Sequence, residues 1–548
     1  MKNGKPYVTF RNIQFLVANN RFAARRASHQ FFCKRVRQSE QVRYPSPSLL
    51  IHPMPAMSHT APGLPALSDR ALLRSQAFLN GHWVDADTRF EVINPADGAV
   101  IASVPNQDGR AAGQAIVAAQ QAFPGWAAKT GKERAVILRR WFDLIVAHAD
   151  DLALLMTAEQ GKPVPEARGE VMYGASFVEW FAEEAKRVNG DVLASPTADR
   201  RLLTLKQPIG VCAAITPWNF PIAMITRKIA PALAAGCTIV IKPAEQTPLS
   251  ALALAELAWR AGLPDGVINV LTADSERSIE IGKVLCASPA VRHLSFTGST
   301  PVGRLLMAQS APTIKKLALE LGGHAPFIVF DDADIDAAIE GALASKYRNA
   351  GQTCVCTNRF YVQDRVYDEF VRKLAKGAAA IRVGNGFEQG VQQGPLIDDQ
   401  AIAKVDEHVS DAISKGAKLE AGGGPHALGG LFYQPTVLSN VSHDMKVMRE
   451  ETFGPVAAVL RFSSEDEAIA AANDTDYGLA SYFYSRDIGR VWRVAEKLEY
   501  GMVGINTGVL SNEVGPFGGV KQSGLGREGS KYGIDEYLEL KYLCIGGI

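Results

Sequence analysis

Buried strands and helices alternate along this chain from about residue 211, and that alternation limits the possible folds more than any other feature. Short apolar segments predict strands at 211–215, 238–241 and 267–270. Between them, apolar residues spaced three and four apart predict helices at 222–235 and 249–261. Strands that alternate with helices of this length form a parallel sheet. The sequence therefore predicts an α/β fold whose functional residues lie on the loops that follow the strands.

A second block of the same kind begins with the strand predicted at 325–329 and ends near Tyr484. The chain has 548 residues, and a single hydrophobic core rarely grows beyond about 250–300. Two α/β domains in sequence are therefore expected. Ahead of the first block, the sequence predicts a short strand at 91–93 and amphipathic helices at 133–148 and 166–187.

The composition excludes several functional classes. A formal net charge of +1 provides no basic field that would attract nucleic acid. No apolar run reaches the roughly 18 residues that a membrane-spanning helix needs, so no membrane association is expected. The seven cysteines are few for the length and odd in number, which is not typical of a secreted disulfide framework. No Cys or His cluster has zinc-binding spacing, so no metal site is expected.

The segment from Met1 to Ser39 is rich in Lys and Arg and contains no Asp or Glu. Three explanations remain open for it: a mitochondrial transit peptide, a disordered basic arm, or a start codon assigned too early. Met57 opens a segment that is typical of a bacterial N-terminus. Residues 1–66 are therefore predicted to form an extension outside the fold. A cytoplasmic location is expected, with the mitochondrial matrix as the alternative if the segment is a transit peptide.

The segment around Cys354 reads NAGQTCVC at 349–356 and is rich in small residues, so its backbone can approach a substrate closely. A lone cysteine is usually a small buried hydrophobic residue. The interpretation of Cys354 as a nucleophile therefore depends on the surrounding motifs. Those motifs are, in chain order, TPWNFP at 216–221, KPAE at 242–245, FTGSTPVG at 296–303, LELGG at 319–323, EETFGP at 450–455 and PFGG at 516–519.

These motifs, in this order and at these separations, closely resemble those of the aldehyde dehydrogenase superfamily. The resemblance extends from about Phe78 to the C-terminus. Within the superfamily, the segments GQTCVC, RKIAPALAAGCTIVIKPAEQTP and GREGSKYGIDEYLELKY are most similar to those of succinate-semialdehyde dehydrogenases. The resemblance implies an aldehyde dehydrogenase-like fold, with two α/β parallel-sheet domains and a small bridging sheet. It also implies oxidation of succinate semialdehyde to succinate with NAD(P)⁺, as in 4-aminobutyrate degradation. Glutarate semialdehyde, or another aldehyde with an acid at its far end, is the alternative substrate.

The resemblance assigns catalytic roles to Cys354, Glu320 and Asn219. An aldehyde does not readily lose hydride until a nucleophile has added to its carbonyl carbon. A Cys354 thiolate would add to give a thiohemiacetal, whose collapse expels hydride and leaves a thioester. The Asn219 amide and the Cys354 backbone N–H would hold the oxyanion, and Glu320 would activate the water that hydrolyses the thioester. A non-catalytic binding protein on the same fold would be expected to lack one of these residues, and all three are present.

A glycine-rich turn after the strand predicted at 294–296 opens a helix, whose N–H groups can face a pyrophosphate. The resemblance assigns Lys242 and Glu245 to the adenosine ribose, and Glu451 to the nicotinamide ribose with Phe453 beside it. NAD or NADP is therefore the expected cofactor, and the Glu245 carboxylate favours NAD because it repels the 2′-phosphate of NADP. The complete predicted cofactor set is Trp218, Lys242, Pro243, Ala244, Glu245, Gly298, Ser299, Thr300, Pro301, Val302, Gly303, Leu321, Glu451 and Phe453.

The carboxylate at the far end of the substrate needs a cation or hydrogen-bond donors. Arg227 and Arg348 match the arginines that this branch uses for that purpose. Ser511 and Asn512 lie where the resemblance implies a pocket-wall hydroxyl, and the sequence leaves open which of the two fills the role. The expected partner is therefore a small aldehyde that carries a carboxylate.

The resemblance also implies a cofactor domain at 67–321, a catalytic domain at 322–521 and a C-terminal segment at 522–548. Residues 191–207 and the strand near 537–544 are expected to form the bridging sheet. Polar and apolar residues roughly alternate at 201–206, as in an edge strand, and such strands usually pair with another subunit. A homodimer or homotetramer is therefore expected.

Cys354→Ala is expected to abolish oxidation of the aldehyde, because the thioester can no longer form. Binding of NAD(P) should survive, since its main predicted contacts lie on Lys242, Glu245 and residues 298–303. Steady-state production of NAD(P)H and a fluorescence titration of the cofactor measure the two properties. Near-wild-type turnover in this variant would contradict the mechanism.

Overall fold

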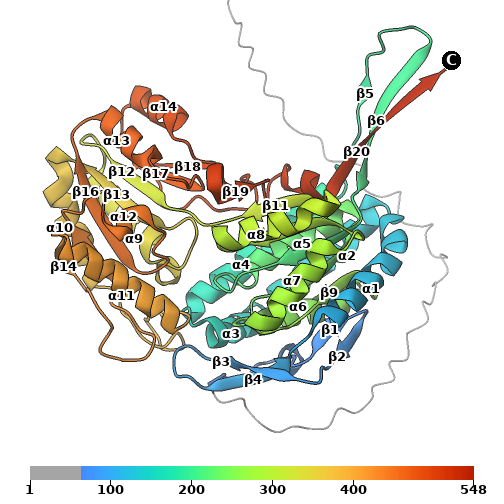
Figure 1. Ribbon diagram of the computed structural model, residues 1–548, viewed down its shortest axis with the longest axis horizontal. Helices are drawn as coiled ribbons and strands as arrows, with labels where there is room; N and C mark the ends of the chain where they lie inside the picture. Colours follow the sequence, from blue (N-terminus) through green and yellow to red (C-terminus); the bar gives the residue numbers. More distant parts are fainter. Residues whose placement is uncertain (1–62, 548) are drawn as a thin grey trace, which may run out of the picture. The chain divides into compact units, whose positions relative to one another are not determined.

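The computed structural model of the protein describes residues 63–547, and Figure 1 shows how their helices and strands are arranged. Hydrogen-bonded strands within this range form two large sheets, a three-stranded sheet and a two-stranded sheet. Both large sheets are mainly parallel and are covered by helices, so the predicted α/β class is confirmed. The basic N-terminal segment and Met57 lie outside the described residues.

The first sheet is parallel at its centre and antiparallel at its edges. Its strands lie in the spatial order β19 (Gly524–Leu525), β11 (Lys316–Glu320), β10 (Val291–Thr297), β7 (Val211–Ile215), β8 (Thr238–Lys242), β9 (Ile268–Val270), β1 (Ala77–Leu79) and β2 (His82–Val84). The strands from β11 to β9 run parallel, as the alternating pattern predicted. Strand β7 matches its predicted range to the residue. The carboxyl ends of these parallel strands therefore meet at one edge of the sheet.

Helices cover both faces of this sheet. They are α1 (Gly109–Ala127), α2 (Gly131–Ala147), α3 (Ala149–Gln160), α4 (Val164–Glu184), α5 (Ala223–Ala235), α6 (Pro248–Arg260), α7 (Ser275–Ala287) and α8 (Thr300–Ser310). Alternate residues of β7 face different cores: Cys212 and Ala214 pack with α2, α4, α5 and α6, whereas Val211 and Ala213 pack with α1, α7 and α8. Local signals start several helices, such as the capping box of Thr130 and Glu133 at α2.

The second sheet is built in the same way. Its strands lie in the order β14 (Lys418–Ala421), β15 (Thr436–Ser439), β16 (Val456–Phe462), β13 (Thr357–Gln363), β12 (Ala325–Val329), β17 (Ala480–Tyr484) and β18 (Met502–Ile505). Its helices are α9 (Ile335–Tyr347), α10 (Tyr367–Ala379), α11 (Asp399–Ser414), α12 (Lys446–Arg449), α13 (Glu465–Asn473) and α14 (Ile488–Lys497). The alternation continues beyond the predicted end at Tyr484, because α14 leads to one further parallel strand, β18. That strand is short and contains Gly504, which weakens its sequence signal.

Short 3₁₀ turns connect several of these elements, and one of them precedes Cys354. They are η1 (Arg70–Leu72), η2 (Ala311–Thr313), η3 (Arg348–Gly351), η4 (Asp364–Val366), η5 (Lys521–Ser523) and η6 (Gly533–Tyr537).

The third sheet joins β20 (Leu538–Gly546), β6 (Arg200–Pro208) and β5 (Val192–Leu193), as Figure 1 shows. The segments predicted for the bridging sheet therefore pair with each other. The prediction that 201–206 is an edge strand is wrong, because β6 is central and pairs with β20 and β5 on its two sides. Alternation reflects the two faces of a strand and not its neighbours in the sheet, so the pattern could not distinguish a central strand from an edge strand. A separate hairpin joins β3 (Arg89–Ile93) and β4 (Val100–Pro105).

The chain passes from the first sheet to the second between Glu320 and Ala325, and it returns to the first sheet at β19. This crossing places the ends of β7, β10 and β11 next to the segments that lead into β13 and β16. The predicted division into domains at residues 321 and 521 stays a prediction. Among the helices of residues 63–547, none is both long enough and apolar enough to cross a bilayer.

Candidate active site

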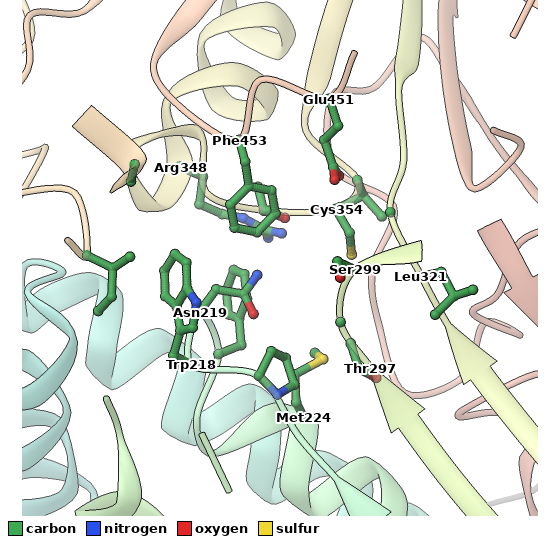
Figure 2. Close-up of a pocket in the computed structure, with 18 of the residues that line it drawn as sticks. Trp218, Asn219, Met224, Thr297, Ser299, Leu321, Arg348, Cys354, Glu451 and Phe453 are labelled. Atoms are coloured by element: carbon green, nitrogen blue, oxygen red, sulfur yellow. The ribbon is translucent and has the colours of Figure 1, made fainter. Parts of the chain in front are cut away.

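A cavity of about 440 Å³ lies between loops of the two large sheets. Loops that follow β7, β10 and β11 line one side, and the segments before β13 and β16 line the other. In Figure 2, Trp218 and Asn219 lie across this space from Arg348, Cys354 and Phe453. The predicted site residues in its lining are Trp218, Asn219, Arg227, Gly298, Ser299, Leu321, Arg348, Cys354, Glu451, Phe453 and Ser511.

The other predicted residues lie outside this lining. Thr300 and Pro301 line a neighbouring cavity of about 500 Å³. Glu245 lines a third cavity of about 820 Å³, which also contains Asp274 and Asp398. The complete set outside the lining is Glu320, Lys242, Pro243, Ala244, Glu245, Thr300, Pro301, Val302, Gly303 and Asn512.

The turn before Cys354 depends on backbone conformations that few residues adopt. Asn349, Ala350 and Gly351 have φ angles of 50°, 55° and 74°. Asparagine tolerates this region better than most residues, whereas Ala350 adopts it under strain. A Cβ atom on Gly351 would lie 2.2 Å from the carbonyl oxygen of Gly454, so only glycine allows the segment before β16 to come this close. The turn ends the helical run of α9 and places Cys354 at the cavity.

The Cys354 side chain reaches the cavity, but protein atoms surround most of it. Burial raises the pKa of the thiol to about 12, and the carboxylates of Glu451 and Glu320 act in the same direction. The positive charges of Arg227 and Arg348 oppose this rise. In the cofactor-free protein the thiol is therefore protonated at neutral pH, and only a small thiolate fraction can attack a carbonyl.

Asn219 offers a hydrogen-bond donor opposite Cys354. Its Nδ2 donates to the carbonyl oxygen of Gln352 over 3.0 Å, which leaves its second N–H for another acceptor. Asn219 Oδ1 has no hydrogen-bond partner among the described residues. The backbone N–H of Cys354 also has none within residues 63–547. Two donors, one from each side of the cavity, can therefore serve an oxygen atom bound at Cys354.

Glu320 is the last residue of β11 and is buried. Neither of its carboxyl oxygens has a hydrogen-bond partner in the described part of the chain. Burial and the negative charge of Glu528 raise the pKa of Glu320 well above its usual value, against the opposing charge of Arg227. A carboxylate in this environment accepts a proton readily, which is the property that a general base requires.

Glu451 and Phe453 come from the segment before β16. Glu451 Oε1 accepts a hydrogen bond from the backbone N–H of Gly323 over 2.9 Å. Burial raises the pKa of Glu451 to about 7, so this carboxyl group titrates near neutral pH. The Phe453 ring meets the Trp218 ring edge to face, with 5.7 Å between their centroids. One wall of the cavity is thus aromatic and the adjoining one acidic.

Glu528 lies in the segment GREGSKYGIDEYLELKY, which gave it no predicted role, yet it contacts two cations of α5. Arg227 Nε lies 2.8 Å from Glu528 Oε2, and Lys228 Nζ contacts the other carboxylate oxygen. All three side chains are buried. The Arg227 guanidinium also stacks on the Phe517 ring at 4.0 Å, and its Nη2 has no partner in residues 63–547. Arg227 therefore presents to the cavity a cation whose charge is partly neutralised within the protein.

Arg348 differs from Arg227 in its surroundings. It begins the turn before Cys354, is only partly buried and forms no salt bridge with any described residue. Its guanidinium lies 5.3 Å from the centre of the Phe220 ring. Arg348 is thus the less neutralised of the two cations that line the cavity.

Ser511 and Asn512, the two candidates for a residue of the pocket wall, have different surroundings. Ser511 lines the cavity. Asn512 Oδ1 accepts hydrogen bonds from the backbone N–H groups of Val514 and Gly515, over 3.0 and 2.7 Å. The Asn512 side chain therefore stabilises its own turn and does not face the cavity.

The carboxyl ends of β7 and β10 carry open groups that fit the phosphates of a dinucleotide. Ser299 precedes α8 without capping it, so the first N–H groups of this helix remain open to an anion. A Cβ atom on Gly298 would lie 2.4 Å from the Phe296 ring, so glycine here allows that ring to pack against the turn. Two buried hydroxyls, Thr216 Oγ1 and Thr297 Oγ1, have no partner among the described residues.

Lys242 and Glu245 form a pair at the end of β8. Lys242 Nζ donates to Glu245 Oε2 over 3.3 Å. Burial lowers the pKa of Lys242, while the Glu245 carboxylate partly restores it. The Glu245 side chain is 32% exposed, so a ribose hydroxyl could reach it from solvent. The pair offers one donor and one acceptor at neighbouring positions.

Part of the cavity wall has no sequence motif that would identify it. Phe220 and Phe517 belong to the motifs at 216–221 and 516–519, so those motifs could have identified them. The remaining wall residues come from α4, α5 and the 397–404 segment, and only the fold brings them to Cys354. They are Tyr173, Met224, Ile397, Asp398, Gln400, Ala401 and Lys404.

Known proteins resemble this chain in sequence and structure. The profile of the aldehyde dehydrogenase family matches residues 83–543. A glutarate-semialdehyde dehydrogenase from Pseudomonas aeruginosa is 63% identical over 484 residues, which cover 88% of this chain and 100% of that protein. A succinate-semialdehyde dehydrogenase (NADP⁺) from Escherichia coli is 61% identical over 482 residues, with coverages of 88% and 99%. The crystal structure of a succinate-semialdehyde dehydrogenase from Burkholderia pseudomallei aligns with a TM-score of 0.87 at 63% identity, and covers 88% of this chain and 100% of that one.

Glu451→Gln is expected to accelerate the alkylation of Cys354 by iodoacetamide above about pH 8, because it removes a negative charge that disfavours the thiolate. Below about pH 6 the two proteins should react alike, since the wild-type Glu451 carboxyl, with its pKa of about 7, is then protonated. Mass spectrometry of the Cys354 peptide, without cofactor, measures the rate.

Glu450→Gln is the matched control, because Glu450 is an adjacent carboxylate whose side chain is 56% exposed. It should not change the rate at any pH. Equal rates for Glu451→Gln and the wild type at pH 8.5 would show that Glu451 does not control the thiol.

Proposed function

Because this chain belongs to the aldehyde dehydrogenase family, we propose that it oxidises an aldehyde with a carboxylate at its far end, and succinate semialdehyde in particular. The observation that carries the proposal is the content of the cavity at Cys354. One wall combines the thiol with Arg348, and the facing wall combines the Asn219 amide with Arg227. A reactive thiol, an oxyanion donor and two cations therefore surround the same space.

Cys354 is the nucleophile in this proposal. Its thiol loses a proton to solvent, and Sγ forms a bond to the aldehyde carbon, so that the carbonyl oxygen becomes an oxyanion. The free N–H of the Asn219 amide and the Cys354 backbone N–H stabilise that oxyanion. Loss of one such donor typically lowers the rate about 10²–10³-fold.

When bound, NAD(P)⁺ would supply the acceptor for the hydride of the former aldehyde carbon. The acyl group remains on Cys354 Sγ as a thioester. Glu320 takes a proton from the water that attacks this thioester, and the carboxylic acid and the Cys354 thiol are released. The raised pKa and the unpartnered oxygens of Glu320 support this role. Since Glu320 is absent from the cavity lining, its side chain turns toward Cys354 when it acts.

The residues that would hold NAD(P) follow from the open groups described above. Lys242 and Glu245 would bind the adenosine ribose, and the N-terminus of α8 would bind the pyrophosphate. Glu451 would bind the nicotinamide ribose, with Phe453 beside it. NAD is proposed as the preferred cofactor, because the Glu245 carboxylate accepts hydrogen bonds from ribose hydroxyls and repels a 2′-phosphate.

The positive charges in the cavity lining support a substrate that carries a carboxylate. Arg348 and Arg227 both line the cavity, and a carboxylate between them would gain charge-assisted hydrogen bonds. The hydroxyl of Ser511 lies in the same wall and can add a donor. Since Arg227 already contacts Glu528, Arg348 supplies the larger share of the attraction.

Glutarate semialdehyde is the second candidate, and the Pseudomonas aeruginosa relative that bears this name favours it. The two substrates differ by one methylene group. A difference of this size usually changes transition-state binding by only about 1–3 kcal/mol, so both aldehydes should react.

We also propose a homodimer or homotetramer that assembles through the sheet of β5, β6 and β20. This sheet exposes large apolar side chains, among them Val192, Leu540 and Tyr542. Exposed strands with apolar side chains readily pair with another chain.

Steady-state kinetics of the purified protein test the proposed function. The substrates are succinate semialdehyde, glutarate semialdehyde and the neutral aldehyde butanal, each with NAD⁺ and with NADP⁺. The proposal requires the highest kcat/KM for succinate semialdehyde. A preference for glutarate semialdehyde would transfer the proposal to the second candidate, and a preference for butanal would contradict both.

Arg348→Ala is expected to lower kcat/KM for succinate semialdehyde about 10- to 150-fold, because the carboxylate loses a contact worth about 1.5–3 kcal/mol. The value for butanal should change much less. Arg227→Ala should lower both values, since it also leaves the buried Glu528 carboxylate with one cation fewer. Arg461→Ala, which removes an exposed arginine on β16 outside the cavity, should change neither. Equal losses on both aldehydes in Arg348→Ala would mean that Arg348 does not bind the carboxylate.

Glu245→Ser is expected to shift the ratio of kcat/KM values from NAD⁺ toward NADP⁺, because it removes the carboxylate that repels the 2′-phosphate. Glu91→Ser is the matched control, since Glu91 lines the same 820 Å³ cavity but lies on β3. It should leave the ratio unchanged. A wild-type enzyme that clearly prefers NADP⁺ would show that Glu245 turns away from the ribose.

A further inference from the structure

Asn349, five residues before Cys354, uses every polar group that it has. Its Nδ2 donates to the carbonyl oxygens of Asn219 and Gln352, over 2.9 and 3.2 Å. Its Oδ1 accepts from Gln160 Nε2 over 3.0 Å, and its backbone N–H donates to Glu166 Oε1 over 2.7 Å. Its own carbonyl oxygen accepts from the backbone N–H of Gln352 over 3.0 Å. A buried side chain with this many partners has one orientation only.

The two carbonyl groups that Asn349 bridges belong to different sheets. Asn219 follows β7 of the first sheet, whereas Gln352 leads through Cys354 into β13 of the second. The Asn219 amide itself donates to the same Gln352 carbonyl oxygen over 3.0 Å. The Asn349 amide therefore closes a ring of hydrogen bonds between the two turns that carry the oxyanion donors.

We propose that Asn349 is a positioning residue that holds the Asn219 amide against the Cys354 turn, so that both N–H donors point to the same oxygen atom. The proposal rests on the proposed function, because the oxyanion arises only if Cys354 attacks an aldehyde. Asn349 itself touches neither the cavity nor a reacting atom. It acts through Asn219 and through the turn that ends at Cys354.

The Asn219 turn has a second support, which comes from its own side of the cavity. Lys162 Nζ donates to the Asn219 carbonyl oxygen over 2.8 Å and pairs with Glu170. Glu170 Oε1 in turn accepts from the backbone N–H groups of Ile222 and Ala223 at the start of α5. These contacts would keep the turn folded without the Asn349 side chain. Without that side chain, the hydrogen bond that joins this turn to the Cys354 turn would be lost. The substitution is therefore expected to lower the reaction rate.

The backbone conformation of Asn349 allows a substitution that removes the side chain and preserves the turn. Its φ angle of 50° lies in the left-handed region, which glycine adopts without strain. Asn349→Gly therefore keeps the turn conformation and removes only the bridging amide. Asn349→Asp also tolerates this φ angle and retains the acceptor for Gln160, but it too lacks the donors.

Asn349→Gly is expected to lower kcat for succinate semialdehyde about 10- to 100-fold, since a displacement of about 1 Å at a catalytic donor can cost this much. KM should stay within about threefold, because the donors act on the oxyanion and not on the bound aldehyde. The decisive measurement is the double variant Asn219→Ala with Asn349→Gly. If Asn349 acts through Asn219, the double variant should be no more than about threefold slower than Asn219→Ala alone.

A matched control separates this role from a loss of stability. Asn269 on β9 is also a buried bridging asparagine, which donates to the Gly266 carbonyl oxygen and accepts from the Asn80 N–H, each over 2.9 Å. Asn269→Ala should lower Tm as Asn349→Gly does and leave kcat unchanged. Asn349→Asp should lower kcat at least as much as Asn349→Gly, because its carboxylate would also face the carbonyl oxygens of Asn219 and Gln352.

Three results would overturn the proposal. They are an unchanged kcat in Asn349→Gly, a double variant whose loss equals the product of the two single losses, and loss of the folded state in both Asn349 variants. The wild-type and Cys354→Ala measurements come first. An inactive wild type, or an active Cys354→Ala, would contradict the proposed function itself. An active wild type with an inactive Cys354→Ala and a fully active Asn349→Gly would contradict this inference alone.

Discussion

Hydrogen bonds between the turn after β7 and the turn before Cys354 are the contact on which the rest of the site depends. Each sheet alone provides half of the cavity: one supplies Asn219, and the other supplies Cys354. The Gln352 carbonyl oxygen accepts from amides of both Asn219 and Asn349. Because these groups are buried, any shift that separates the turns would leave unpaired polar atoms, which costs about 1–3 kcal/mol each. The turn after β7 and the turn before Cys354 are therefore held in one position relative to each other.

Burial at this junction also controls the ionisable groups. The pKa of Cys354 rises to about 12 and that of Glu451 to about 7, and the pKa of Glu320 rises well above its usual value. All three shifts have burial as their largest cause, because a low-dielectric surrounding disfavours charge. The arginines oppose the shifts at Cys354. A bound cofactor and an acidic substrate would change these charges, so the reactivity of the thiol depends on what else occupies the cavity.

Much of the fold follows from the order of polar and apolar residues. Strands β7 and β12 match their predicted ranges to the residue, because fully buried parallel strands form short apolar runs bounded by turn residues. The prediction for β6 was wrong about its place in the sheet. Alternation reports which side of a strand meets solvent, and an exposed central strand shows the same pattern as an edge strand.

Of the residues in the candidate site, some could be identified from the sequence and others could not. Residues in motifs near strand ends, such as Asn219 and Cys354, could be identified from the sequence, since an α/β fold brings the carboxyl ends of its strands together. The role of Glu528 could not be identified, although its segment resembles the family, because only the fold buries its carboxylate beside Arg227 and Lys228.

By itself, the sequence determined the class of fold, the family and the residues that can carry the chemistry, because these depend on residue type and local spacing. Only the tertiary structure decided which of these residues share one cavity, and that Ser511 faces it while Asn512 stabilises a turn. It also decided that Arg227 is paired with Glu528, whereas Arg348 has no salt bridge within residues 63–547. Those outcomes depend on contacts between residues far apart in the chain, and burial, charge pairing and hydrogen-bond partners arise only when both sheets pack together.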